Sequence, residues 1–333
     1  MNSVQESQIQ VAREQLEATK NTIQTFIVGQ KDALNQILWS MAAGGHALLE
    51  GLPGVGKTMM IRTISEAMEL TFSRVQFTPD LMPSDITGTM MIEPNEMGKQ
   101  QFIFHKGPVF TNIVLADEIN RATPKTQSAL LEAMGEKTVT VFGETKELPA
   151  PFFVLATQNP IDLEGTYPLP EAQMDRFICK INITYPTKEE LKTIVERTVT
   201  DNQQEISPVI TGVEVLEIQK AAANILVAED ILDIAVTFIM ATHPDHELAP
   251  ESIKNYVRFG AGPRGLQSLV KIAKVRAFME GRFHVSIGDL KQAALPVLRH
   301  RIFLNFEGEA TGITTDTLIL DVIESVTNAI QRT

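Results

Sequence analysis

Cysteine is almost absent from this sequence. The single cysteine, Cys179, has no second cysteine with which to form an internal disulfide bond. It lies in the apolar run Phe177-Ile178-Cys179, which predicts a buried side chain in a protein of a reducing compartment. A small disulfide-stabilised scaffold is therefore excluded, and a cytoplasmic protein is expected.

Long hydrophobic runs and an excess of positive charge are also missing. No segment approaches the roughly 20 consecutive apolar residues that a membrane-spanning helix needs, and residues 1–24 hold no apolar signal core. We therefore expect no direct insertion into a membrane. The 29 basic and 41 acidic side chains give a formal net charge of −12, which repels nucleic-acid phosphates. Nucleic acid is not expected as the main partner.

Apolar residues are abundant, at 44% of the 333 residues, which is enough for one large or two ordinary domains. Short apolar segments, typical of buried strands, alternate with helical patterns through the first half of the chain. These segments are residues 46–50, 74–77, 113–116, 152–156 and 179–183. The alternation predicts an α/β fold in which helices cover both faces of a parallel sheet.

The core is predicted to span residues 27–186 and to carry two insertions. Residues 79–106 contain a short helical piece and two strand patterns joined by a turn rich in Pro, Asn and Gly. Residues 138–148 form a second predicted hairpin, which turns at Gly143-Glu144. Both insertions interrupt the regular alternation of the core.

The two ends of the chain have their own patterns. Residues 1–26 show a weak helical periodicity, with Ile9, Val11 and Leu16 among polar residues, and predict an N-terminal amphipathic arm. From residue 187 to residue 333 the pattern is helical throughout, which predicts a separate all-α domain.

Gly51-Leu52-Pro53-Gly54-Val55-Gly56-Lys57-Thr58 matches the phosphate-binding pattern G-x-x-x-x-G-K-[ST] in full, between a predicted strand and a predicted helix. The glycines let backbone N–H groups converge on phosphate oxygens at the start of the helix. Lys57 supplies positive charge for the β and γ phosphates, and Thr58 supplies a hydroxyl ligand for Mg²⁺. The motif predicts ATP and Mg²⁺ as cofactors.

Asp117 and Glu118 follow the apolar segment Ile113-Val114-Leu115-Ala116. Side chains alternate along a strand, so Asp117 can face the Mg²⁺ ion while Glu118 reaches the attacking water as a general base. An isolated Asp-Glu pair is often only a solvated strand end. The complete phosphate-binding motif upstream favours the catalytic interpretation.

Two further residues have open alternatives. Asn159 follows the strand pattern of residues 152–156, where it could hydrogen-bond the γ-phosphate or cap the turn before Pro160. Arg176, in Met174-Asp175-Arg176-Phe177, could reach the γ-phosphate of a neighbouring subunit or form an internal salt bridge. Arg299, His300 and Arg301 follow Pro296 and are interpreted as charges at the C-terminal end of a helix.

Four segments together resemble the MoxR family of AAA+ ATPases, in the group that includes the magnesium chelatase ATPase subunits. They are Ile27-Val28-Gly29-Gln30, Leu115-Ala116-Asp117-Glu118-Ile119-Asn120-Arg121, Ala156-Thr157-Gln158-Asn159-Pro160 and Glu171-Ala172-Gln173-Met174-Asp175-Arg176-Phe177. The resemblance runs from about residue 27 to about residue 303. It implies a P-loop AAA+ core followed by a helical lid, which here is residues 187–333.

The resemblance also implies a role for each matching residue. Lys57 and Thr58 correspond to Walker A, Asp117 and Glu118 to Walker B, Asn159 to sensor 1, Arg176 to the arginine finger and Arg264 to sensor 2. The implied catalytic residues are Glu118, Lys57, Asn159, Arg176 and Arg264, and the implied metal ligands are Thr58 and Asp117. The implied nucleotide-binding residues are Val28, Gly29, Gly51, Pro53, Gly54, Val55, Gly56, Lys57, Thr58, Met59 and Asp117.

The sequence departs from the family pattern around Arg264. The family usually has a serine before the preceding proline and an alanine after the arginine, where this chain has Gly262 and Gly265. The insertions at residues 79–106 and 138–148 correspond to a helix-2 insert and a pre-sensor-1 hairpin. Residues 136–147 hold two lysines and three glutamates, which disfavours a DNA motor.

The function implied by the resemblance is ATP hydrolysis in a homo-oligomeric ring, a hexamer, that remodels or matures a protein client. Insertion of a metal cofactor into the client and cooperation with a von Willebrand factor A domain protein are further expectations of the same kind. A nucleotide-gated scaffold, which controls a partner by its binding state with little turnover, is the alternative. A small-molecule kinase shares the P-loop but does not account for Asn159, Arg176 and Arg264.

Overall fold

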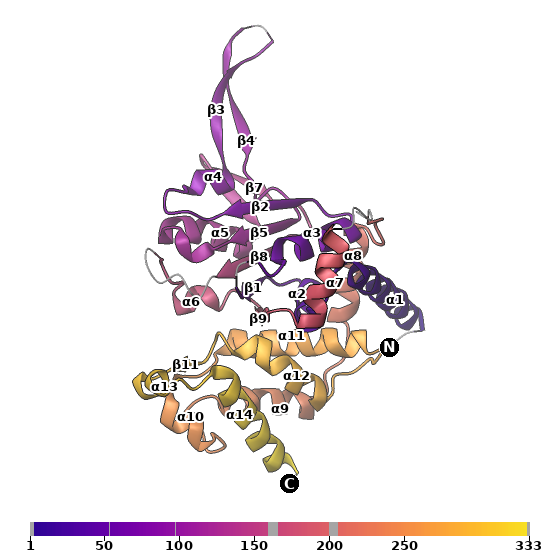
Figure 1. Ribbon diagram of the computed structural model, residues 1–333, viewed down its shortest axis with the longest axis vertical. Coiled ribbons are helices and arrows are strands. Elements are labelled where there is room, and N and C mark those ends of the chain that lie inside the picture. The colour runs from indigo at the N-terminus through magenta and orange to yellow at the C-terminus, as the bar shows by residue number, and fades with distance from the viewer. Residues whose placement is uncertain (1–2, 53, 97, 159–165, 200–205, 332–333) are drawn as a thin grey trace.

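The computed structural model describes residues 3–52, 54–96, 98–158, 166–199 and 206–331. Its centre is a five-stranded parallel sheet in the order β2-β5-β8-β1-β9 (Figure 1). The strands are β1 (Ala47–Glu50), β2 (Phe72–Gln76), β5 (Ile113–Asp117), β8 (Phe153–Gln158) and β9 (Cys179–Asn182). The inner strands are continuous apolar runs because both faces of the sheet are covered. The predicted α/β class is confirmed.

Two hydrophobic cores lie on opposite faces of this sheet. Side chains alternate along each strand, so Leu49, Leu115 and Leu155 join one core while Leu48 and Val114 join the other. The larger core includes α1, α2 and α3, and the smaller one includes α5. These helices are α1 (Ser3–Phe26), α2 (Lys31–Ala42), α3 (Lys57–Ala67) and α5 (Pro124–Glu136).

The N-terminal helix α1 is docked on the body of the protein. Its buried side chains, Ile9, Ala12, Leu16 and Ile23, recur at helical spacing and join the larger core. The helix contacts α3, α8 (Gly212–Ala223) and α11 (Pro263–Met279), so it touches both the α/β core and the later helical region. Figure 1 shows α1 beside α8 and α7 (Lys188–Val199) at one flank of the sheet.

Two hairpins project from the core. The long one, β3 (Gly88–Pro94) with β4 (Gln100–Lys106), stands out from the body after the short helix α4 (Pro83–Thr87), as Figure 1 shows. The shorter one pairs β6 (Thr138–Val141) with β7 (Glu144–Glu147). Gly88 and Gly107 lie at the base of the long hairpin, where a Cβ on either residue would collide with the backbone opposite. Both glycines are therefore required by close approach.

The C-terminal region is a helical lid. Its helices are α9 (Glu229–Met240), α10 (Glu251–Tyr256), α11 (Pro263–Met279), α12 (Ile287–Leu298), α13 (Phe306–Thr311) and α14 (Thr315–Ile330). One short antiparallel pair, β10 (Val257–Phe259) with β11 (Phe303–Leu304), joins them. Figure 1 shows α11 and α12 directly beneath β9. Among the helices in the described ranges, none has the length and hydrophobicity that crossing a membrane requires.

Candidate active site

The phosphate-binding loop lies between β1 and α3, at the carboxyl edge of the sheet. α3 begins at Lys57, and Gly56 at its N-cap has φ 81°, while Gly54 has φ 80°. Among the described residues, and apart from the adjoining backbone, no atom lies within 4 Å of the place where a Cβ on either glycine would be. Glycine is therefore required by the left-handed backbone and not by lack of space. The loop aims the N-terminus of α3 at the space where phosphates would bind.

Lys57 is held by its own loop. Its Nζ donates a hydrogen bond of 2.9 Å to the carbonyl oxygen of Gly51. Burial lowers the pKa of Lys57, and the negative charges of Asp117 and Glu118 act in the opposite direction. The ammonium group therefore lies in the field of both carboxylates, as a phosphate-binding lysine must if phosphate, metal ion and base share one site.

Asp117 ends β5, and both of its carboxylate oxygens are engaged. Thr157, at the end of β8, donates from Oγ1 to Oδ1 of Asp117 over 2.6 Å. Arg74, on β2, approaches Oδ2 with Nη2 at 2.6 Å and Nε at 3.2 Å. The carboxylate is thus fixed from the two strands that flank its own, which sets the direction in which it can meet a metal ion.

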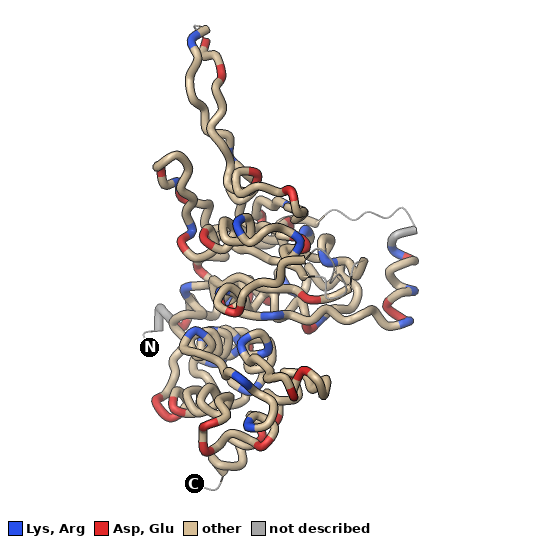
Figure 2. The backbone as a smooth tube through the Cα atoms, turned by 90° about the vertical axis from the view of Figure 1, so that its left-hand side faces the viewer, with Lys and Arg blue, Asp and Glu red and all other residues tan. Residues whose placement is uncertain are grey.

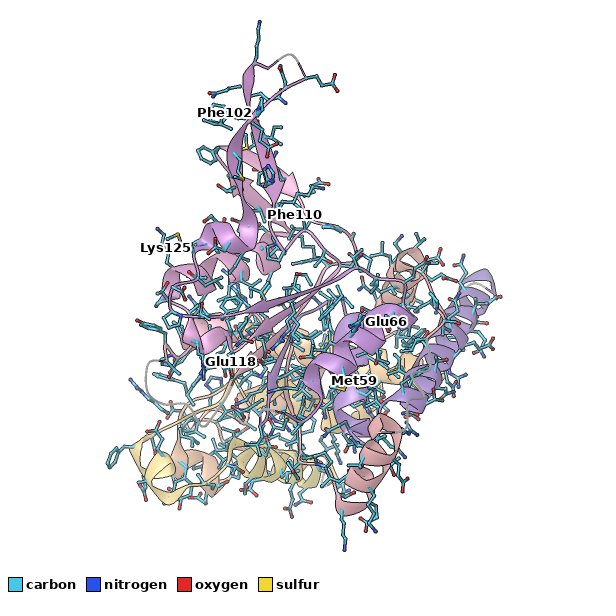
Figure 3. The ribbon with its side chains drawn as sticks, turned by 45° about the horizontal axis from the view of Figure 1, so that its top comes forward. Met59, Glu66, Phe102, Phe110, Glu118 and Lys125 are labelled. Atoms are coloured by element: carbon cyan, nitrogen blue, oxygen red, sulfur yellow. The ribbon has the colours of Figure 1, made fainter. Side chains whose placement is uncertain are left out.

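Glu118 follows in a left-handed turn, with φ 57°. Its N–H donates to Oγ1 of Thr157 over 2.8 Å, so one hydroxyl bonds to both acidic residues. Its Oε2 accepts a hydrogen bond of 2.7 Å from Nε2 of Gln76 on β2. The same oxygen lies 3.2 Å from Nε of Arg121. A non-glycine residue rarely adopts this backbone conformation, and such strain is concentrated at functional sites. Figure 3 shows Glu118 at this edge of the sheet.

Arg74, Gln76 and Thr157 are site residues that the sequence reasoning missed. Arg74 and Gln76 are two positions apart on β2, so they share one face of that strand. Their order in the sequence gives no reason to place them beside residues more than 40 positions later. Thr157 carried a weak signal, because it lies at the end of an apolar strand pattern next to Asn159.

The predicted nucleotide-binding residues Val28 and Gly29 lie in the connection between α1 and α2. Gly29 has φ 71°, and the side chain of Glu190, from α7, occupies the place where its Cβ would lie. Val28 is half-buried. The side-chain amide of Gln30 donates a hydrogen bond of 2.7 Å to the carbonyl oxygen of Thr184. This loop is therefore anchored to the segment between β9 and α7.

Some of the predicted site residues are placed less directly. Thr58 is half-buried in the first turn of α3, and Met59 is exposed on the same helix (Figure 3). Gly51 lies against Ile183, the residue that follows β9. Pro53 and Asn159 fall outside the described residues. The structure thus brings Lys57 and the two carboxylates together but leaves the sensor-1 prediction untested.

The two predicted arginines are engaged with their own chain. Arg176 is exposed, and its Nη1 donates a hydrogen bond of 2.6 Å to the carbonyl oxygen of Leu131 on α5. Arg264 is exposed in the first turn of α11, with Nη1 4.0 Å from Oδ2 of Asp175. Neither contact settles whether these arginines act on a nucleotide, and their roles stay predictions.

The residues present fit a nucleotide with Mg²⁺. Asp117 and Thr58 offer the hard oxygen ligands that Mg²⁺ prefers, together with substrate phosphates. Oδ1 of Asp117 accepts a hydrogen bond from Thr157, and a carboxylate oxygen has a second lone pair with which it can meet a cation. Oδ2 pairs with Arg74, an arrangement that a bound cation would have to share or displace. The oxygen ligands at this site are therefore suitable for Mg²⁺. Arg74 competes with a bound Mg²⁺ ion for Oδ2 of Asp117.

Comparison with known proteins identifies the family. Residues 46–179 match the model of the "ATPase family associated with various cellular activities (AAA)", and residues 251–322 match that of the AAA lid domain. A relative named "Chaperone MoxR1", from Mycobacterium tuberculosis, is 42% identical over 304 residues, 91% of this chain and 80% of its own length. This chain belongs to the MoxR family of AAA+ ATPases.

Further comparisons agree with this assignment. "Protein MoxR" from Methylorubrum extorquens is 30% identical over 318 residues, covering 90% of this chain and 91% of that protein. A crystal structure of a Cytophaga hutchinsonii protein assigned as an ATPase superposes with a TM-score of 0.90 at 41% identity, over 96% of both chains. The predicted family and the predicted AAA+ core with a helical lid are both confirmed.

Proposed function

We propose that this chain works in the cytoplasm as an ATP-hydrolysing subunit of a homo-oligomeric ring, a hexamer, that remodels or matures a protein client. The observation that carries the ATPase part is the group formed by Lys57, Asp117 and Glu118 at one edge of the sheet. A phosphate-binding lysine and two carboxylates on adjacent residues are the parts that hydrolysis of a nucleoside triphosphate needs. A ring is the assembly that AAA+ ATPases commonly form.

Each residue has a defined part in the reaction. Lys57 and the backbone of the loop hold the β and γ phosphates, while Thr58 and Asp117 hold Mg²⁺, which supplies charge neutralisation when bound. Glu118 takes a proton from water as the water oxygen bonds to the γ-phosphorus and the bond to the leaving ADP oxygen breaks. Asn159 orients that water or the γ-phosphate, and Arg264 meets the nucleotide from the lid.

Arg176 belongs to the reaction of the neighbouring subunit in this proposal. It is exposed, and a hydrogen bond to the carbonyl oxygen of Leu131 holds it against α5. A guanidinium of this kind, supplied in trans, stabilises the charge of the transition state by roughly 10³- to 10⁵-fold in rate. Assembly is then required for turnover, because each site is completed by the next subunit.

The client is a protein, and the projecting hairpins support this. Phe102 is 69% exposed on the long hairpin and pairs with the exposed Ile92, and Phe142 is exposed in the turn of the short hairpin. Figure 3 shows Phe102 well away from the body of the protein. Exposed aromatic and aliphatic side chains on a strand edge are suited to unfolded or extended polypeptide.

Charge along the hairpins also favours a protein client. Figure 2 shows acidic and basic residues of both hairpins interspersed, and the −12 net charge of the chain opposes a polyanionic partner. A client that receives a metal cofactor, and a partner with a von Willebrand factor A domain, are the finer expectations. Both rest on the family resemblance alone.

The test is ATP hydrolysis measured against protein concentration, with mass by light scattering, for the wild type, Glu118→Gln and Arg176→Ala. Activity per subunit should rise as rings assemble. Glu118→Gln and Arg176→Ala should assemble and bind ATP but lose hydrolysis. Concentration-independent activity that survives Arg176→Ala would refute the trans arrangement, and normal turnover by Glu118→Gln would refute the base.

A second function is favoured by the contacts on the acidic pair. Arg74 pairs with Asp117, while Gln76 and Arg121 hold Oε2 of Glu118, so neither carboxylate is poised for turnover in this arrangement. A nucleotide-gated scaffold would use ATP binding to release these contacts and alter a partner's site. Tight ATP binding with a hydrolysis rate unaffected by Arg176→Ala, and partner binding that follows ATP, would favour the scaffold.

A further inference from the structure

The C-terminal end of α12 is fastened to the strand that follows Arg176. The predicted interpretation of Arg299, His300 and Arg301 as helix-end charges is incomplete, because His300 and Arg301 are buried. Each of the three donates to at least one backbone carbonyl of the ATPase core, and Arg299 also pairs with Asp316 of the lid. Arg299 donates a hydrogen bond of 3.1 Å to the carbonyl oxygen of Lys180. His300 donates one of 3.0 Å from Nε2 to the carbonyl oxygen of Phe177. Figure 1 shows α12 and β9 side by side at this place.

Arg301 makes the densest set of these contacts and is only 3% exposed. On the lid side it bonds to Val297 O and, over 3.2 Å, to Ser268 Oγ of α11. On the core side its Nε donates 2.7 Å to Oδ1 of Asp175. Its two terminal nitrogens also reach carbonyl oxygens of the core, which are Asp175 O at 3.3 Å, Phe177 O at 2.7 Å and Ile178 O at 3.2 Å. One guanidinium therefore joins two lid helices to one core segment.

That segment contains Arg176. The residue before it, Asp175, is bound to Arg301 through both side chain and backbone, and the residue after it, Phe177, gives its carbonyl to both His300 and Arg301. Burial and the charge of Arg301 hold the pKa of His300 well below its ordinary value, so the ring stays neutral and donates from Nε2. The backbone on both sides of Arg176 is thus set by the lid.

Asp175 also connects this clamp to Arg264. Its carboxylate binds Arg301 through Oδ1 and lies 4.0 Å from Nη1 of Arg264 through Oδ2. Arg264 and Ser268 are four residues apart on α11, so they lie on the same face of that helix. Movement of α11 would therefore shift Arg264, which lies near Asp175, and Ser268, which accepts a hydrogen bond from Arg301.

We propose that Arg301 is a positioning residue for Arg176: it fixes the lid to the finger segment, so that the lid of one subunit sets the finger that enters the site of the next. The inference rests on the proposed function of Arg176 as a finger in trans. A movement of the lid that brings Arg264 to its own nucleotide then displaces Arg176 at the neighbouring site. The nucleotide state of each subunit is passed on in this way.

The test uses mixed rings. Arg301→Lys keeps one positive charge near Asp175 but cannot reach the carbonyls of Phe177 and Ile178 together, so the finger segment is loosened. Alone, this variant should lose about 10- to 100-fold in the rate at saturating ATP, with less than a twofold change in KM, because its own nucleotide contacts remain. Subunits of Arg301→Lys are then assembled together with subunits of Glu118→Gln.

Mixing should restore activity. The Arg301→Lys subunits have intact carboxylates and receive an intact finger from Glu118→Gln neighbours. Assembly of Arg176→Ala with Glu118→Gln is the reference pair and should recover in the same way. If the reference pair recovers and the Arg301→Lys pair does not, Arg301 acts within its own subunit and the inference is wrong. If the reference pair also fails to recover activity, Arg176 does not act as a finger in trans. The inference about Arg301 is then wrong as well, because it rests on that role.

Two further variants separate positioning from folding. Arg282→Lys changes another lid arginine, which is 33% exposed and pairs with Asp289 through two hydrogen bonds of 2.7 Å entirely within the lid. It should keep the wild-type hydrolysis rate, whereas an equal loss would show that general loosening of the lid is sufficient. Asp175→Asn keeps the size of the side chain, removes its charge, and serves in the same mixing assay if Arg301→Lys does not fold. Its rate loss should likewise be restored by Glu118→Gln subunits, and no restoration would overturn the inference.

Discussion

The side-chain amide of Gln76, on β2, donates a hydrogen bond of 2.7 Å to the carboxylate of Glu118, at the end of β5. The side-chain oxygen of Gln76 accepts a hydrogen bond of 3.1 Å from Arg74, which in turn forms an ion pair with Asp117. One strand therefore restrains both carboxylates of the proposed site. β2 leads through α4 into the long hairpin, so the residues that restrain the acids lie one short segment away from the proposed client surface.

Removal of this restraint should raise basal ATP turnover. Gln76→Ala deletes one of the two contacts described above on Oε2 of Glu118, so that the carboxylate can turn more readily toward the attacking water. We expect a several-fold higher hydrolysis rate without client, measured by phosphate release at saturating ATP. Gln101→Ala, an exposed glutamine of the hairpin, should leave the rate unchanged. A lower rate in Gln76→Ala would instead show that Gln76 orients Glu118 productively.

Thr157→Val should impair both hydrolysis and stability. Valine has nearly the same shape but cannot donate to Asp117 or accept from the N–H of Glu118. Loss of a buried hydrogen-bond partner costs about 1–3 kcal/mol, and a misplaced acidic pair should lower the rate about tenfold or more while raising the Mg²⁺ concentration required. Thr145→Val on the short hairpin is the matched control. Unchanged Mg²⁺ dependence would show that Thr157 does not position Asp117.

Acid should destabilise the protein through His46. This ring is buried, donates from Nε2 to Met134 O and accepts at Nδ1 from the N–H of Val154, and burial lowers its pKa to about 4. Because the unfolded state has the higher pKa, of about 6.5, it binds more protons between these values, and stability is lost as pH falls from about 6.5 to about 4. The loss from this residue is on the order of 3 kcal/mol.

Urea unfolding at pH 7.5, 6.5, 5.5 and 4.5 would measure this effect. His46→Asn keeps an acceptor for the N–H of Val154 but cannot take up a proton. It should be less stable than the wild type at pH 7.5 and should lose less stability over the acid range. His300, whose pKa is also lowered, acts in the same direction and leaves a residual slope. Identical slopes for the wild type and the variant would contradict the assignment.

The docking of α1 should contribute measurably to stability. Leu16 is 3% exposed among side chains of the larger core, whereas Val11 on the same helix is 54% exposed. Leu16→Ala should lower the free energy of unfolding by about 2–4 kcal/mol, because it removes buried apolar contacts and leaves a cavity. Val11→Ala should change it by less than about 0.5 kcal/mol. Equal effects in a urea titration would show that α1 is not docked in solution.

Phe102 should matter for the client and not for basal turnover. We expect a permanently unfolded polypeptide to stimulate ATP hydrolysis of the wild type, and Phe102→Ser to lose most of that stimulation while its basal rate stays the same. Phe306→Ser is the matched control, because Phe306 is 87% exposed on α13 of the lid, away from the hairpin. Loss of stimulation in both variants would indicate nonspecific attraction to exposed aromatic residues.

The phosphate-binding loop was predictable because its requirements are local. The sequence predicted a helix at the end of the motif, and α3 runs from Lys57 to Ala67. Strand positions were predicted with small shifts. The first strand of the alternation after that helix was predicted at residues 74–77 but is observed as Phe72–Gln76, because pairing from Phe72 with Ile113 to Gln76 with Asp117 sets its ends. Strand limits depend on the partner strand, which sequence periodicity does not contain.

The sequence by itself determined the family, the α/β core with its helical lid, and the nucleotide-binding motif. The motif follows from eight consecutive residues, the core and the lid from the periodicity of their segments, and the family from the resemblance of four short segments. Within each such segment, backbone conformation and side-chain spacing leave few options. Only the tertiary structure decided that Arg74 and Gln76 restrain the acidic pair and that Arg301 is buried against the segment of Arg176. These contacts join segments about 40 to 125 residues apart, and the packing of strands and helices brings them together.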